Sequence, residues 1–365
     1  MNKVKRKKAW TYRASLLACS IAAIALAGCQ PTPRNEPGLA GNAAADSAPT
    51  AFKVDKVSLP GEGRGDYLTV DTDANRLYVT HSTVVHVLDL TTLRPLFQVD
   101  GLKGAHGVAL DPARGHGFVT DGKQNAVVMF DLATGKTIKA IPAGKKPDSI
   151  VHDLASGMIF AFNGESSDVS VIDSDKAEVI KTIKLPNAPE FSQSDGLGKL
   201  WVNLAKGNAI AEIDTTTLAL DRTIKLDGCE RPGPLAFDPT DRLLFAGCTG
   251  NSLLAVVDPD SGKIIATAKV GEDPDGIAYD DARDRIFVAN RKGGWTIIDQ
   301  LDKTQYALNR ILPIDDDAGT VSVDPKTHRA FTSTADLFRP NDKAGNGASP
   351  MAKPGTFRLM VVSEK

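Results

Sequence analysis

The stretch Tyr67-Leu-Thr-Val-Asp71 is followed by a short polar turn and by Arg76-Leu-Tyr-Val-Thr80, and this pair of segments decides the fold because it recurs along the chain. Both segments alternate apolar and polar residues, which is the pattern of a β-strand with one buried face. The later counterparts of Asp71 follow at spacings of 40, 42, 42, 43, 42 and 44 residues and are Asp111, Asp153, Asp195, Asp238, Asp280 and Asp324. The chain therefore contains seven copies of one unit.

A second Asp recurs within these units and confirms the period. It ends segments such as Val87-Leu-Asp89 and Val171-Ile-Asp173, and a polar turn then leads into a fourth apolar segment. Four short strands in about 42 residues is typical of a propeller blade, and seven blades fall within the usual number. We predict an all-β fold, a seven-bladed β-propeller of four-stranded blades.

The two ends of the repeat region complement each other. After Asp324 the chain supplies a strand near Phe331 and another at residues 357–362, and it lacks a fourth. An unassigned strand, residues 52–59, precedes the first unit. We expect the last blade to be closed by this N-terminal strand, because that pairing removes an exposed sheet edge.

The N-terminus has the features of an export signal. Basic residues precede an apolar run, Leu16–Ala27, which is shorter than the roughly 20 residues of a membrane-spanning helix. Leu26-Ala27-Gly28-Cys29 resembles the lipobox of bacterial lipoproteins, in which the cysteine receives the lipid. We expect a signal peptide at 1–28, lipidated Cys29 with a flexible, Pro- and Ala-rich linker at 29–50, and the propeller at 51–365. An ordinary membrane anchor is the alternative.

The resemblance also implies a location, because Gln30 rather than Asp follows the cysteine. By similarity to lipoprotein sorting, we expect an exported protein anchored on the periplasmic side of the outer membrane. Loss of residues 1–28 removes six basic side chains and leaves 37 basic against 45 acidic ones, a net charge of −8. This charge argues against nucleic acid as a partner, so the expected membrane contact is the lipid.

The repeat resembles the YVTN-type repeats of YncE-like bacterial propellers. The motifs that carry the resemblance are Arg76-Leu-Tyr-Val-Thr80, Arg285-Ile-Phe-Val-Ala-Asn290 and Val169-Ser-Val-Ile-Asp173. The resemblance covers the whole repeat region and departs at Gly198-Lys-Leu-Trp201, which is one residue short. It implies export and a propeller fold, and it does not imply one activity.

Candidate binding residues come from the positions at which the inner strands of a propeller meet the channel mouth. Five residues before each first Asp, the ionisable candidates are Asp66, His106, Asp148, Glu190 and Asp275. At the ends of the second strands, the polar candidates are His81, Asp121, Asn163 and Asn290. Such residues could hold a divalent cation or a cationic or hydroxylated ligand, although turn chemistry explains many of them equally well.

Two further features belong to the same face. Cys229 precedes the first strand of its blade and Cys248 ends the neighbouring strand, so a disulfide between them fits an oxidising compartment, with free thiols as the alternative. The loop 339–354 could cover the mouth, and residues 315–317, three consecutive Asp, are expected to add negative charge to its rim.

The sequence favours a non-catalytic, membrane-tethered binding or scaffold protein, a monomer that presents its channel face to a protein or small ligand. No nucleophile–base motif or nucleotide-binding loop is readable, so no catalytic residue and no cofactor is assigned beyond one possible divalent cation. The alternative is a hydrolase resembling the metal-dependent sugar lactonases, with Glu190, Asn163, Asp148 and Asp275 as candidate ligands and His106 as a base. Nucleic-acid binding, suggested by some YncE-like relatives, ranks last.

Overall fold

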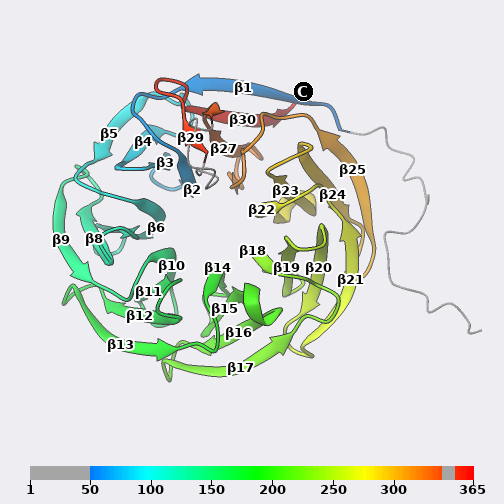
Figure 1. Cartoon of the computed structure of the whole chain (residues 1–365), viewed down its shortest axis with the longest axis horizontal. Coiled ribbons are helices and arrows are strands. Elements are labelled where there is room, and N and C mark those ends of the chain that lie inside the picture. The colour runs from blue at the N-terminus through cyan, green and yellow to red at the C-terminus, as the bar shows by residue number, and fades with distance from the viewer. Residues whose placement is uncertain (1–49, 339–349) are drawn as a thin grey trace, which may run out of the picture. The chain divides into compact units, whose positions relative to one another are not determined.

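A computed structural model describes residues 50–338 and 350–365 of the chain. These residues form seven four-stranded antiparallel sheets and one two-stranded hairpin. The sheets stand around a central channel as the blades of a propeller (Figure 1). The predicted fold class is thereby confirmed. The second and third strands are buried on both faces, because each sheet packs between the blades on either side of it.

Each blade places its first strand beside the channel. Six of these innermost strands are regular, and they are β2 (Gly65–Asp71), β6 (Ala105–Asp111), β10 (Pro147–Asp153), β14 (Pro189–Ser194), β18 (Pro232–Asp238) and β22 (Pro274–Asp280). The seventh, β26 (Ser322–Val323), is short. The second strands are β3 (Arg76–His81), β7 (His116–Asp121), β11 (Met158–Asn163), β15 (Lys199–Leu204), β19 (Leu243–Cys248), β23 (Arg285–Asn290) and β27 (Ala330–Thr334).

The remaining strands lie outward from the channel. The third strands are β4 (Val84–Asp89), β8 (Ala126–Asp131), β12 (Asp168–Asp173), β16 (Ala209–Asp214), β20 (Leu253–Asp258), β24 (Trp295–Gln300) and β30 (Arg358–Glu364). The outermost strands are β5 (Pro95–Val99), β9 (Thr137–Pro142), β13 (Glu178–Lys184), β17 (Ala219–Lys225), β21 (Lys263–Lys269), β25 (Tyr306–Leu312) and β1 (Phe52–Ser58). The two-stranded hairpin pairs β28 (Leu337–Phe338) with β29 (Met351–Ala352).

The seventh blade joins the two ends of the propeller, as the sequence predicted. Its strand order is β1-β30-β27-β26, and β1 pairs with β30 from Phe52 opposite Glu364 to Ser58 opposite Arg358 (Figure 1). Charged pairs reinforce this closure, with Arg285 of the sixth blade bonded to Glu364. The edge of the sheet that β30 would otherwise expose is thus covered by β1.

The recurring Asp residues hold the hairpins on the face away from the channel mouth. The Asp71 carboxylate accepts a hydrogen bond from the backbone N–H of Ala74 at 2.9 Å. Asp89, the second recurring Asp of the same blade, accepts one from the backbone N–H of Thr92 at 2.7 Å. An Asp at the end of an innermost strand can also bind the next blade. The Ser194 hydroxyl of the fourth blade donates a hydrogen bond to Asp153 of the third blade at 2.6 Å. The repeat signal therefore reports turn chemistry and contacts between blades.

A β-bulge near the start of the innermost strand recurs in the first six blades. The pairing with the second strand shifts between Gly65 and Leu68 in the first blade and between Pro147 and Ile150 in the third. Corresponding shifts occur in the other four. A bulge adds a residue to one strand and turns its side chain out of the regular alternation.

In the described residues, no helix is long and apolar enough to cross a membrane. The short helices that are present, η1 (Ala205–Gly207) and η2 (Asp281–Arg283), are single 3₁₀ turns.

Candidate functional site at the channel mouth

The bulges position the first ring of predicted residues. Asp66 lies within the bulge of β2, two residues before Leu68, and Leu68 and Val70 pack in the core of the blade. Strict alternation would bury Asp66 beside them, because residues two apart share a face of a strand. The bulge breaks this alternation and leaves Asp66 on the wall of the channel mouth, and the equivalent positions are His106, Asp148, Glu190 and Asp275.

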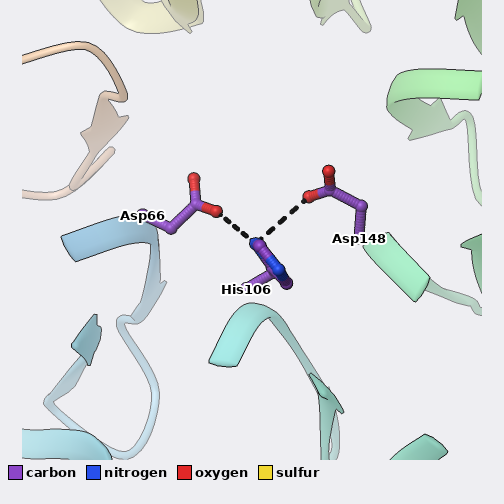
Figure 2. Close-up of side chains that lie close together, drawn as sticks. All are labelled: Asp66, His106 and Asp148. Carbon is purple, nitrogen blue, oxygen red and sulfur yellow. Dashed lines mark hydrogen bonds and ion pairs between the residues drawn. The ribbon is translucent and has the colours of Figure 1, made fainter. Parts of the chain in front are cut away.

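Three residues of this ring contact each other. His106 Nδ1 lies 2.6 Å from an Asp66 carboxylate oxygen and 3.7 Å from one of Asp148 (Figure 2). The three side chains come from the first, second and third blades and retain 24 to 32 % of their exposure. The short distance is that of a charge-assisted hydrogen bond from the imidazole N–H to the carboxylate.

The pKa values of His106 and Asp148 are shifted from their usual values. Burial alone would lower the pKa of His106, but the hydrogen bond to Asp66 and the charges of Asp148 and Asp66 outweigh it and raise that pKa. Burial, followed by the negative charge of Asp66, raises the pKa of Asp148 to about 7. Asp148 therefore titrates near neutral pH, and His106 holds its proton more strongly than a free imidazole does.

The ionised forms of the other two carboxyl groups of the ring, Glu190 and Asp275, are also disfavoured. Burial raises the pKa of Glu190, and the charge of Asp275 adds to this effect. Burial likewise raises the pKa of Asp275, although Arg291, whose Nη2 lies 2.5 Å from it, opposes the change. Burial is thus the main reason that Asp148, Glu190 and Asp275 resist ionisation, and negative neighbours add to it.

The three consecutive Asp residues contribute less free charge than we expected. Asp315 is paired with Lys56 at 2.7 Å and with Arg358 at 2.6 Å. Asp317 lies 3.6 Å from an Arg291 nitrogen and 3.5 Å from one of Arg64. These cations come from strands and loops distant in sequence. The three consecutive Asp residues alone therefore could not show that basic side chains would pair with them.

A pocket of about 270 Å³ opens beside the trio. Its walls carry both signs of charge, from Asp66, His106 and Asp275 of the ring and from Arg64, Lys123 and Arg291. Its lining also includes the hydroxyl-bearing Ser82, Thr320 and Ser333. The pocket is polar enough to hold a charged small molecule.

Tyr67 and Phe191 form the floor of the mouth, and sequence reasoning did not select them. Each directly follows a ring residue, and their ring centroids lie 4.6 Å apart. β2 and β14, which carry them, stand on opposite sides of the channel (Figure 1). Burial, followed by the charge of Asp148, raises the pKa of Tyr67 well above its usual value. A second cavity of about 380 Å³, lined by all seven blades, includes Tyr67 and Phe191 in its wall.

The second ring of predicted residues does not reach the pocket. His81, Asp121, Asn163 and Asn290 are each at most 1 % exposed, and none belongs to the described lining of the pocket. The hydrogen bonds that they make serve their own blades instead, and the buried amide oxygens of Asn163 and Asn290 have no partner among the described residues. Asp121, for example, accepts the backbone N–H groups of Lys103 at 2.7 Å and Gly104 at 3.0 Å.

The two asparagines of that ring act in the same way. Asn163 donates to Asp168 at 2.9 Å, and Asn290 donates to the carbonyl of Gly294 at 2.8 Å. Nδ1 of His81 lies 3.1 Å from Nε2 of His86. The His81 ring also stacks on the ring of Phe357, with centroids 3.7 Å apart. These side chains end regular second strands without a bulge, so they point into the blade and hold loops in place.

Comparison with known proteins assigns the chain to a family. Residues 109–321, more than half of the chain, match the family model described as Domain of unknown function (DUF5074). The chain belongs to this family. The DUF5074 match contains the ring residues Asp148, Glu190 and Asp275, whereas Asp66 and His106 precede it. No curated protein matches the sequence.

The DUF5074 chain also resembles a solved propeller structure. A chain of Kuenenia stuttgartiensis hydrazine synthase superimposes with a TM-score of 0.63 at 15 % sequence identity, over 82 % of this chain and 97 % of that one. At this identity the similarity shows the fold alone. A relationship to YncE-like propellers in particular stays a prediction.

A disulfide lies on the same face of the DUF5074 propeller. Cys229 and Cys248 are bonded, with their Cα atoms 5.1 Å apart, and both are almost fully buried. The bond ties the loop before β18 to the end of β19 and therefore fixes the entry of the fifth blade at the mouth. Two other predictions, lipidated Cys29 and the covering loop 339–354, fall wholly or mostly outside the described residues.

The trio is the one group in the described part of the DUF5074 chain whose ligand atoms gather within 4.8 Å, as a metal site requires. Two ligands at about 2.1 Å from one ion lie roughly 3 Å or more apart. The 2.6 Å between His106 and Asp66 is shorter, so the present geometry is that of a hydrogen bond. A divalent cation would fit only after the Asp66 carboxylate turned away from the imidazole.

Proposed function

We propose that the protein is a lipid-tethered binding propeller that holds the cationic group of a small ligand at its channel mouth. The observation that carries the proposal is the convergence of Asp66, Asp148, Glu190 and Asp275 from four blades on one axis. Burial, together with repulsion from negative neighbours, disfavours the anionic forms of Asp148, Glu190 and Asp275 in the free protein. A bound cation would relieve that repulsion, and this gain would contribute to affinity.

The geometry supports binding better than catalysis. Nε2 of His106 faces Gly122, since a Cβ placed on that glycine would lie 2.8 Å from it, and Nδ1 is engaged by Asp66. The ligand set expected by resemblance to sugar lactonases is also incomplete, because Asn163 is buried within its blade.

Titration calorimetry of the propeller, residues 50–365, with a series of mono- and diamines tests the proposal. We expect saturable binding at pH 8 that weakens by about tenfold or more when both Asp66 and Asp148 are changed to Asn. The matched control is a pair of exposed carboxylates distant from the mouth, Asp175→Asn with Glu178→Asn, which should bind as the parent does. Amine binding that survives the Asp66 and Asp148 changes would contradict the proposal.

The trio also supports a second candidate, the binding of one divalent cation. Metal analysis and thermal unfolding with Ca²⁺, Mg²⁺, Mn²⁺ or Zn²⁺ separate the two. A site at 100 times its dissociation constant adds about 2.7 kcal/mol of stability. Stoichiometric metal that is lost in Asp148→Ala would favour the cation site, whereas amine binding without metal would favour the first proposal.

Tethering is tested separately, because it does not depend on the ligand. In cells labelled with a fatty acid, we expect the label on the parent protein and not on Cys29→Ala, which should be recovered unlipidated. Labelling of Cys29→Ala would rule out that cysteine as the attachment site.

A further inference from the structure

The pocket beside the trio pairs its acidic wall with a cationic rim. Arg64 lies at the opening with one 3.5 Å contact to Asp317. Lys123 lines the same pocket, and among the described residues its ammonium group makes no ion pair. Lys146, two residues before Asp148, is exposed and makes no ion pair within the described ranges, although its charge lowers the pKa of Asp148 and of Glu190. Arg291 pairs with Asp275 at 2.5 Å in the same pocket, whereas Lys123 and Lys146 lie near the carboxylates without a direct ion pair.

A buried hydroxyl in the pocket also lacks a partner. Ser333 is 5 % exposed and lines the pocket, and its Oγ accepts or donates no hydrogen bond to any described residue. An unpaired buried hydroxyl costs about 1–3 kcal/mol, so such groups are uncommon unless something else satisfies them. Oγ itself exposes less than 1 Å² here, so a rotation of the Ser333 side chain toward the pocket would let a polar atom of a ligand supply the missing bond.

These observations specify both ends of the ligand. We infer that the pocket binds a zwitterion of the size of an amino acid or dipeptide, with its ammonium group toward Asp66 and Asp275 and its carboxylate toward Lys123 and Arg64. A molecule with only a cationic end would leave Lys123 unpaired, and one with only an anionic end would meet the acidic wall. This inference rests on the proposed function and names the class of ligand.

A contact between the ligand and Ser333 would give the unpaired hydroxyl a role in binding. In the free protein it contributes no hydrogen bond, so its removal should not lower stability. In the complex it would bond the amide or carboxylate oxygen of the ligand. Ser333→Ala therefore separates a binding role from a structural one.

The test uses amino acids and dipeptides, each in three forms: free, with the carboxylate amidated, and with the amine acetylated. Binding to the full-length protein in detergent is measured by calorimetry. We expect acetylation to abolish binding and amidation to weaken it by about tenfold. In Lys123→Ala the free and amidated forms should bind alike, whereas the control Lys139→Ala, on the outer strand β9, should keep the difference.

Each outcome decides the inference. Three results together support it. The parent protein binds the free form about tenfold tighter than its amide, Lys123→Ala loses this preference, and Ser333→Ala binds more weakly at an unchanged melting temperature. Equal binding of free and amidated forms to the parent protein overturns the zwitterion and leaves the cation-binding function standing. Binding of neither form overturns both.

Discussion

The ring of Tyr67 lies on the ring of Phe191 across the channel, with centroids 4.6 Å apart. The two residues come from the first and fourth blades, and each follows a carboxylate of the mouth, Asp66 and Glu190. The contact therefore forms a floor below the charged pocket.

Loss of the Tyr67 ring should remove this floor. We expect Tyr67→Ala to lower the free energy of unfolding by about 1–3 kcal/mol, because an aromatic contact and half-buried surface are lost. Tyr67→Phe keeps the ring and should change stability far less. Urea unfolding of both variants checks this, and equal losses would mean that the hydroxyl, not the ring contact, is important.

Asp148 should destabilise the free protein at neutral pH. Its folded pKa of about 7 exceeds the ordinary 3.8, so the folded state is penalised progressively as pH rises from about 4 to 7. We expect Asp148→Asn to raise the free energy of unfolding by about 1–2 kcal/mol at pH 8 and to leave it nearly unchanged below pH 4, since coupled neighbours absorb part of the shift. Denaturation curves at the two pH values measure it, and a loss of stability at pH 8 would contradict it.

His81 should make the protein sensitive to acid. Burial, followed by the charge of His86, lowers the pKa of His81 to about 4 from 6.5. The unfolded chain therefore takes up a proton before the folded one, and stability that is complete above pH 6.5 is lost as pH falls toward 4. The expected loss is about 2–3 kcal/mol. His81→Phe, which can still stack on Phe357, should reduce this slope, and an unchanged slope would assign it to other groups.

Gly122 should control the position of His106. A methyl group there would lie 2.8 Å from Nε2, so Gly122→Ala must displace the imidazole from Asp66. We expect the His106 pKa, followed by NMR, to fall in this variant because the hydrogen bond that raises it is lost. Gly164 holds the equivalent place in the third blade and has only an ordinary contact at 3.7 Å. Gly164→Ala should leave the titration unchanged.

The disulfide should stabilise the fifth blade. Cys229 and Cys248 are 19 residues apart, and a cross-link of that length contributes about 2–4 kcal/mol. We expect reduction, or replacement of both cysteines by Ala, to lower the unfolding midpoint by a corresponding amount. Reductant should have no further effect on the double variant, and a parent protein insensitive to reductant would contradict the prediction.

The sequence predicted most of the scaffold and about half of the candidate site. The spacing of Asp71 and its counterparts requires equal units, and equal units of four strands close into a ring. Counting five residues back from Asp71 and its counterparts also located Asp66, His106 and Asp148. This works because each innermost strand has the same number of residues between its turn and the channel mouth. The same counting selected His81 and Asn163, whose side chains point into the blade.

The sequence by itself thus determined the blade number, the closure by the N-terminal strand and the residues at each level of the propeller, since all of these depend on local periodicity. The direction of each side chain was decided by the tertiary structure. Bulges turn Asp66 and its counterparts toward the channel, while regular pairing turns the second ring inward. Contacts such as Tyr67 with Phe191, or Asp315 with Lys56, join segments 124 and 259 residues apart. No local pattern encodes them, because they exist only once the ring has closed.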